Sequence, residues 1–337
     1  MASERSLAVP SSVDASTSFE IGLYREGDEF SICALFEKVF HERKSLAQWR
    51  WQFVESSPAA PHVVVARDRA GIVIGHFGSL PRRACVGKRR FLFAQSVDSM
   101  VDPDRARGLK NPGLFAALVR CWIKRFGNEA EPIAYGLPNR AAYRIGGRFL
   151  GYTRLFDPVM FVKDVDGDAR APLADTESGE HPEPDHDDLW ERAAHRLDVA
   201  VMRDQAYFDW RYVRCPSARY RFVAARRGAT LAAVAVFRDA YLAPDCGAIV
   251  DLLWDGEQRD SLSEVVTRCE ELARAARLHH VVTMLPLHAP ELAILGQLGF
   301  RPTRCGHFVV ARSFSPALPL ERVRDLWWFT FGDSDLV

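Results

Sequence analysis

The residues best suited to chemistry lie between positions 99 and 113, where a polar loop joins an apolar run to a helical one. The apolar run ends at Val101, and the loop that follows contains two glycines and three cations. Asn111 is a good N-cap, and Pro112 suits the first position of a helix. Free N–H groups, the helix dipole and positive side chains would therefore meet at one spot, a combination that suits a pyrophosphate. An ordinary strand–helix connection that happens to be basic is the alternative.

The second half of the chain repeats the first in outline. Three landmarks return in the same order: Trp51 as Trp210, Asp98 as Asp251, and Gly151 as Gly299. Their offsets of 159, 153 and 148 residues are nearly constant. A period this long indicates duplicated domains rather than a solenoid.

Composition describes a globular protein of two ordinary domains. The chain has 337 residues, of which 48% are hydrophobic and 26% charged, and its 44 basic and 44 acidic residues cancel. A chain with balanced charges produces no overall electrostatic field that would attract nucleic acid or an anionic membrane. The seven cysteines form no Cys-x-x-Cys pair, which favours reduced thiols in a cytoplasm over disulfides or a zinc site. No apolar run approaches the ~20 residues that cross a bilayer.

Composition and hydrophobic pattern divide the chain into five parts. We expect a disordered leader over 1–17, a first domain over 18–163, a flexible acidic linker over 164–188, a second domain over 189–313, and a tail over 314–337. The linker contains ten acidic residues against one arginine. The tail ends in an aromatic and then an acidic cluster, and its aromatic residues should dock onto a domain.

Hydrophobic periodicity predicts the same series of elements in both halves. In the first half we expect helices at 28–39, 45–54, 113–126 and 139–150, and strands at 62–67, 72–80, 91–101, 132–135 and 155–162. In the second half we expect helices at 189–199, 205–213, 258–277 and 290–298, and strands at 220–226, 231–238, 248–254, 279–285 and 308–313. The first three strands of each half follow one another as an antiparallel meander.

These motifs together resemble a known family. A strand, an Asp-Pro-Asp-x-x-Arg-Gly loop that starts at Asp102, a helix and a strand are followed by Gly136-Leu137-Pro138-Asn139 and by Leu150-Gly151-Tyr152. This order resembles the GNAT superfamily of N-acetyltransferases over residues 19–163, with a weaker echo over 189–313. The resemblance implies an α/β fold of two tandem GNAT-like domains, each a mostly antiparallel twisted sheet flanked by helices.

The resemblance also implies a site for acetyl-CoA in the first domain. The family's loop holds the pyrophosphate with a pattern near Arg-x-x-Gly-x-Gly, and it is stretched here, with four residues between Gly108 and Gly113. The residues implied to bind the cofactor are Arg107, Gly108, Lys110 and Gly113 at the loop, Met100 and Val101 along the pantetheine arm, and Asn139 near the thiol. After Asp251 the second domain has one glycine and two acids in place of this loop. We therefore interpret the second domain as a degenerate copy.

Two catalytic residues follow from the same resemblance. Asp98 lies beside the expected thioester position and could take the proton of the amine, although it could equally bond to a neighbouring strand. The recurrence of an aspartate at 251 favours this second role. The family's acid is a tyrosine two helical turns after the asparagine, and that position here falls at Gly146-Gly147. Tyr143, one turn earlier, or Tyr152 would have to replace it, or no tyrosine does.

The sequence thus predicts a cytoplasmic N-acetyltransferase that moves an acetyl group from acetyl-CoA to a primary amine of a small molecule or amino sugar. It predicts no metal, nucleic-acid or membrane partner and leaves a homodimer open. The two alternatives are a catalytically silent acyl-CoA-binding sensor or assembly protein, and a peptidoglycan-type aminoacyl transferase. Zero net charge counts against the latter, which draws on aminoacyl-tRNA.

Overall fold

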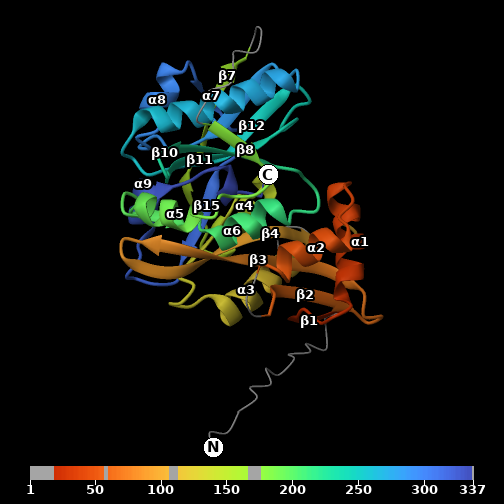
Figure 1. Ribbon diagram of the computed structural model, residues 1–337. Coiled ribbons are helices and arrows are strands. Elements are labelled where there is room, and N and C mark those ends of the chain that lie inside the picture. The colour runs from red at the N-terminus through yellow and green to blue at the C-terminus, as the bar shows by residue number, and fades with distance from the viewer. Residues whose placement is uncertain (1–18, 57–59, 106–112, 166–175, 336–337) are drawn as a thin grey trace, which may run out of the picture.

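Two mixed β-sheets form the framework of the protein. The structure is a computed structural model, and it describes residues 19–56, 60–105, 113–165 and 176–335. Figure 1 shows the two sheets as the centres of two lobes, which we call the first and second lobes. The first sheet contains β1 (Phe19–Leu23), β2 (His62–Asp68), β3 (Val73–Val86), β4 (Arg89–Val101), β5 (Ile133–Gly136), β6 (Thr153–Phe156), β9 (Val199–Val201), β15 (Val309–Ser313) and β16 (Trp327–Trp328). The second sheet contains β7 (Val159–Asp164), β8 (Thr176–Gly179), β10 (Arg221–Arg227), β11 (Thr230–Arg238), β12 (Cys246–Trp254), β13 (His280–Met284) and β14 (Arg301–Arg304).

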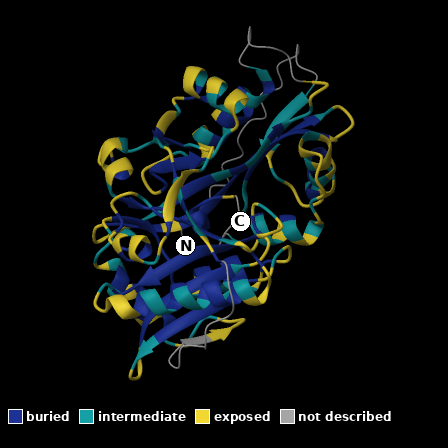
Figure 2. Ribbon diagram, turned by 90° about the horizontal axis from the view of Figure 1, so that it is seen from above, coloured by how far each residue is buried: buried dark blue, intermediate teal, exposed yellow. Residues whose placement is uncertain are grey.

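Helices cover both sheets. In the described residues they are α1 (Asp28–Phe40), α2 (Leu46–Phe53), α3 (Gly113–Phe126), α4 (Arg140–Phe149), α5 (His186–Ala194), α6 (Gln205–Phe208), α7 (Arg259–Ala275), α8 (Leu292–Gln297) and α9 (Leu320–Leu326), with a π-helical turn η1 (Asp209–Val213) and a 3₁₀ turn η2 (Phe331–Asp333). Their outer faces are exposed, whereas the central strands are buried (Figure 2).

The alternation of side chains along β2 shows how the first sheet is covered. Val63 and Val65 pack into one core, which includes residues of α1 and α2, and Val64 packs into a second core under α3. Because successive side chains of a strand point to opposite faces, a continuous apolar run is what a sheet covered on both faces requires. The helices α1 and α2 therefore lie on one face and α3 on the other.

The two sheets exchange one strand each. β15, near the end of the chain, lies between β5 and β6 in the first sheet, and β7 lies between β13 and β14 in the second. The single strand predicted over 155–162 is therefore wrong, because it is two strands that belong to different sheets. Pro158 lies at the break and has no N–H with which to continue a ladder. The division of the chain at residues 163 and 189 stays a prediction, since these strands cross it.

The described end of the acidic segment, from residue 176 on, contains regular elements that its composition does not predict. β8 pairs with the edge strand β10, and α5 already begins at His186. Arg226 explains part of this order, because its guanidinium lies 2.8 Å from carboxylate oxygens of both Glu183 and Asp185. The negative charge that favoured a flexible linker is thus partly neutralised by one arginine of the second sheet.

The aromatic tail docks as predicted. Trp327, Trp328, Phe329 and Phe331 are all buried, and β16 pairs with β9. Within the described ranges, no helix is long and apolar enough to cross a membrane, and no group of histidine, cysteine or acidic side chains could hold a metal ion.

Candidate active site

A cavity opens where β4 and β5 separate. These parallel strands pair only through Phe93–Gln95 and Ile133–Tyr135, whereas β4 continues to Val101 along β3. At the point of separation, a Cβ atom on Gly136 would lie 3.0 Å from the main-chain oxygen of Ser96, so glycine suits this close approach. Residues 96–99 and 136–139 line the resulting cavity of about 220 Å³, which we call the strand cavity.

A β-bulge directs Asp98 toward this cavity. The register of β3 and β4 shifts between the pairs Gly78–Val97 and His76–Met100, so that two residues of β4 face one of β3. Asp98 takes a φ of 50°, in the left-handed region that aspartate tolerates better than most residues. His76 supports the bulge, because its Nδ1 lies 2.8 Å from the main-chain oxygen of Asp98. The imidazole is fully buried, and this burial lowers its pKa to about 4, so it is neutral at pH 7.

Lys44 forms an ion pair with Asp98. Its ammonium contacts Oδ2 of the carboxylate, and both side chains are almost buried, with 11% and 12% of their surface exposed. Lys44 also donates to Oε1 of Gln52 at 2.6 Å and lies 4.4 Å from the ring centre of Phe36. The carboxylate is therefore held in one place by a cation from the loop between α1 and α2.

A second cavity lies between the lobes and meets the first at Asp98. This interlobe cavity has a volume of about 380 Å³ and is lined from both halves of the chain. From the first half come Lys44, Trp51, Arg82 and Gln95 among others, and from the second Trp210, Arg211, Ser334 and Asp335. The residues that line both cavities are Phe40, Val97, Asp98 and Asp335. Two molecules bound in the two cavities would thus meet beside a pair of carboxylates.

Asp335 is a second acid at this junction. The residue is exposed at the surface and lines both cavities. Desolvation of its carboxylate by the surrounding protein atoms, followed by the nearby negative charge of Asp98, raises the pKa of Asp335 to about 6. A carboxylate with such a pKa can accept a proton near neutral pH.

The residues predicted to bind the cofactor are distributed as follows. Asn139 lines the strand cavity, where its side-chain oxygen accepts from the N–H groups of Ala141 and Ala142 and caps α4. Gly113 begins α3 with a φ of 63°. Met100 is buried in the core and Val101 is half-buried, and both continue β4 beyond the residues that line the cavity. Three further predicted residues, Arg107, Gly108 and Lys110, lie outside the described residues.

The two candidate tyrosines differ in position. Tyr143 packs edge to face on Phe308, with ring centres 4.9 Å apart, and does not line the strand cavity. Tyr152 does line it. Its ring lies against Gly146, where a Cβ atom would come within 2.1 Å of it. Burial raises the pKa of Tyr152 above its ordinary value, so the hydroxyl carries its proton at pH 7.

Solved structures resemble this architecture, although no protein-family model and no curated protein sequence matches the chain. A GCN5-related N-acetyltransferase from Anabaena variabilis superposes with a TM-score of 0.66 and 14% identity, over 88% of this chain and 73% of that one. Another from Kribbella flavida has a TM-score of 0.61 and 14% identity, over 88% and 71%. The N-myristoyltransferase of Saccharomyces cerevisiae, solved with myristoyl-CoA bound, has a TM-score of 0.59 and 12% identity, over 92% and 84%.

The chain has the fold of the GCN5-related N-acetyltransferases. The fold expected from the loop and strand motifs is thereby confirmed, as are the two sheets flanked by helices. At these identities the likeness concerns the fold alone.

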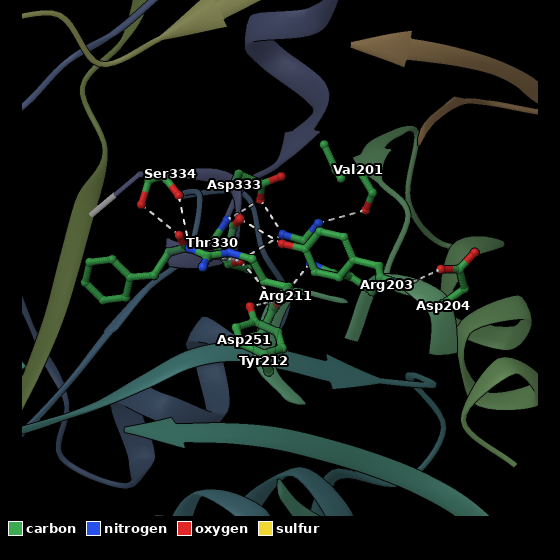
Figure 3. A network of polar contacts seen from close by, with 12 residues as sticks. Val201, Arg203, Asp204, Arg211, Tyr212, Asp251, Thr330, Asp333 and Ser334 are labelled. Carbon is green, nitrogen blue, oxygen red and sulfur yellow. Dashed lines mark hydrogen bonds and ion pairs between the residues drawn. The ribbon is translucent and has the colours of Figure 1, made fainter. Parts of the chain in front are cut away.

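Within this GNAT fold, Asp251 of the second lobe has a structural role. Its Oδ2 lies 2.7 Å from Nε of Arg203, and Tyr212 and Thr330 donate hydrogen bonds to the same carboxylate. Asp333 binds the other side of Arg203 at 2.6 Å (Figure 3). Both ion pairs are completely buried. Residues of the C-terminal tail therefore cover Asp251 in the second lobe. The corresponding aspartate of the first lobe, Asp98, lines two cavities instead.

Sequence reasoning missed three residues of this GNAT-fold site: Lys44, Arg82 and Asp335. Lys44 could have been found, because Arg203 follows it by the 159 residues that also separate Trp51 from Trp210. Asp335 belongs to the acidic cluster that the sequence placed in the tail, but nothing in the sequence shows that the tail returns to β4. Arg82 lies next to a second arginine, Arg83, on β3, and nothing in the sequence shows that only Arg82 lines the interlobe cavity.

Proposed function

We propose that this protein is an acyl-CoA-dependent N-acyltransferase that moves an acetyl group from acetyl-CoA to a primary amine of a small molecule. The observation that carries the proposal is the junction of two cavities at Asp98 and Asp335, within a fold that N-acetyltransferases share. The strand cavity would take the donor, and the interlobe cavity the acceptor.

The strand cavity fits the pantetheine arm of an acyl-CoA. Beyond Gln95 the edge of β4 that faces β5 pairs with no strand among the described residues, so its main-chain groups can bond to the amides of the arm. We propose that Met100, Val101 and Asn139 also contact the donor, and that Arg107, Gly108, Lys110 and Gly113 hold its pyrophosphate. A loop followed by a helix start is suited to that charge.

The reaction is a direct transfer. The neutral amine attacks the thioester carbonyl, the C–S bond breaks, and the proton of the amine leaves to a base. We assign the role of base to Asp335. Asp98, beside it, would hold the ammonium form of the acceptor, and it would take the proton if Asp335 does not. Main-chain N–H groups of the β4 bulge would stabilise the oxyanion. Tyr152 would protonate the leaving thiolate, and Tyr143 stays the alternative acid.

Titration calorimetry of the whole protein with acetyl-CoA, CoA and myristoyl-CoA tests the proposal. We expect micromolar binding of acetyl-CoA, lost in Gly136→Val, because the added side chain would occupy the point where β4 and β5 part. Gly296→Ala is the matched control, since no atom lies within 4 Å of its added Cβ. Absence of binding to the wild type would overturn the proposal. Tighter binding of myristoyl-CoA would replace acetyl by a longer acyl group.

Binding without turnover would favour the silent sensor. An acceptor screen with a thiol assay for released CoA separates the two cases, because only an enzyme releases the thiol in the presence of an amine.

A further inference from the structure

Arg82 is a buried cation that lacks a carboxylate partner among the described residues. It lies on β3 with 5% of its surface exposed, and its Nε donates to Oε1 of Gln95 at 3.0 Å. Its guanidinium carbon lies 4.0 Å from the ring centre of Trp210. For the part of the chain that the structure describes, no hydrogen bond or ion pair occupies its two Nη groups.

This state is unusual for a buried arginine in this protein. Arg203 has two carboxylates, and Arg67 is paired with Asp28. A buried charge without a counter-ion is costly, and this burial lowers the pKa of Arg82 to about 10. The side chain lines the interlobe cavity, so its free N–H groups are available to a molecule bound there.

The other cations of the cavity are already engaged. Lys44 is paired with Asp98, and Arg211 donates to the main-chain oxygen of Ser334 at 3.4 Å. Arg82 is thus the cation best placed to receive an anionic ligand. A planar guanidinium with two free Nη groups matches a carboxylate in a bidentate arrangement.

The cavity has the opposite charge at its other end. Gln95, which holds Arg82, precedes Asp98 by three residues on β4, and Arg82, Asp98 and Asp335 line the same cavity. A small ligand that carries both a carboxylate and an amine can therefore contact the cation and the two acids at once.

From this arrangement we propose that the acceptor is an amino acid or a closely similar compound, with its carboxylate on Arg82 and its amine at Asp98 and Asp335. This proposal rests on the proposed function, because only a transferase has an acceptor substrate. The binding of a carboxylate at Arg82 can be measured without any transfer.

Calorimetry without donor tests the site on matched pairs, each an amino acid and the amine that remains when its carboxylate is removed. We expect at least one amino acid to bind the wild type at least tenfold more tightly than its amine. In Arg82→Met this ratio should fall toward one, and in Arg82→Lys it should be intermediate. Arg83→Met is the matched control, because Arg83 is the next residue of β3, half-exposed and paired with Asp204, and does not line the interlobe cavity.

Two results would overturn the inference: no amino acid that binds more tightly than its amine, or a ratio that Arg82→Met leaves unchanged. If Arg82→Met does not fold, the wild-type ratio and Arg82→Lys still decide. A failure of the proposed function alone would give a different result. Amino acids would still bind in a manner that depends on Arg82, but the protein would not bind acyl-CoA.

Discussion

Trp51 and Trp210 stack on one another across the two lobes, and each indole N–H donates to the main-chain oxygen of the other residue. Their ring centres are 5.2 Å apart with planes 12° from parallel, and the two hydrogen bonds measure 2.7 and 2.9 Å. The same two residues are the first landmark of the sequence repeat. A contact in which both partners use the same atoms is what an approximate two-fold relation between duplicated units would produce. The duplication stays a prediction that this contact supports.

The pair Trp51 and Trp210 should couple the lobes energetically. We expect Trp51→Leu and Trp210→Leu to be non-additive, with a coupling free energy of about 0.5–1.5 kcal/mol from the stacked rings, and more from the two hydrogen bonds. Chemical denaturation of both single variants and the double variant measures it. Trp51→Leu combined with Trp190→Leu, a buried tryptophan of α5 that does not stack with Trp51, should be additive. Full additivity of the first pair would contradict a direct coupling.

Arg203 should be far more important for stability than an exposed arginine. Replacing it with methionine leaves Asp251 and Asp333 buried without their cation, and we expect a loss of about 3–5 kcal/mol in the free energy of unfolding. The same change at Arg221, which forms a partly exposed ion pair with Asp239, should cost less than about 1 kcal/mol. Because the network holds the tail, limited proteolysis should also release the C-terminus faster in Arg203→Met. Equal losses in the two variants would be evidence against the role of the network.

Asp335 should set the acidic limb of the rate profile. A base must be deprotonated, and its pKa is raised from 3.8 to about 6, so kcat/KM should rise with pH up to about 6 and then level off. Asp335→Asn should remove this limb and lower kcat by about 10²–10⁴-fold. Asp98→Asn is the comparison. If it abolishes the limb while Asp335→Asn leaves it in place, then Asp98 is the base.

Tyr152 and Tyr143 can be separated by removing each hydroxyl. Since Tyr152 lines the strand cavity and Tyr143 packs on Phe308, we expect Tyr152→Phe to lower kcat by roughly 10–10²-fold and Tyr143→Phe to leave it within twofold. Binding of acetyl-CoA, measured by calorimetry, should be similar in both. The reverse order of effects would restore Tyr143 as the acid.

Gly146 and Gly147 offer a matched test of the cavity wall within one helix. A methyl group at 146 would lie 2.1 Å from the ring of Tyr152, whereas one at 147 meets only a main-chain oxygen at 3.7 Å. Gly146→Ala should therefore displace the ring and weaken acetyl-CoA binding at least tenfold. Gly147→Ala should leave binding unchanged and stabilise α4 by about 0.5–1 kcal/mol, because alanine forms helices better than glycine. Unchanged binding in both variants would show that Tyr152 does not shape the donor site.

The sequence by itself determined most of the order of helices and strands, although not β1, β8, β9, β14 or the division of β6 from β7, and it determined the resemblance to a GNAT fold. Local signals are sufficient for this, because apolar periodicity follows from which faces of an element are buried. The resemblance also implied that Asp98 lies beside the expected thioester position, whereas the recurrence of an aspartate at 251 favoured a structural role for it.

Only the tertiary structure decided what these residues contact. Asp98 and Asp251 have similar local sequences, yet one is open to two cavities and the other is sealed by Thr330 and Asp333, which lie about 80 residues further along the chain. The exchange of β7 and β15 between the sheets, and the return of Asp335 to β4, are likewise contacts between distant segments. No local pattern encodes such contacts, because burial and charge pairing there depend on which surfaces the folded chain brings together.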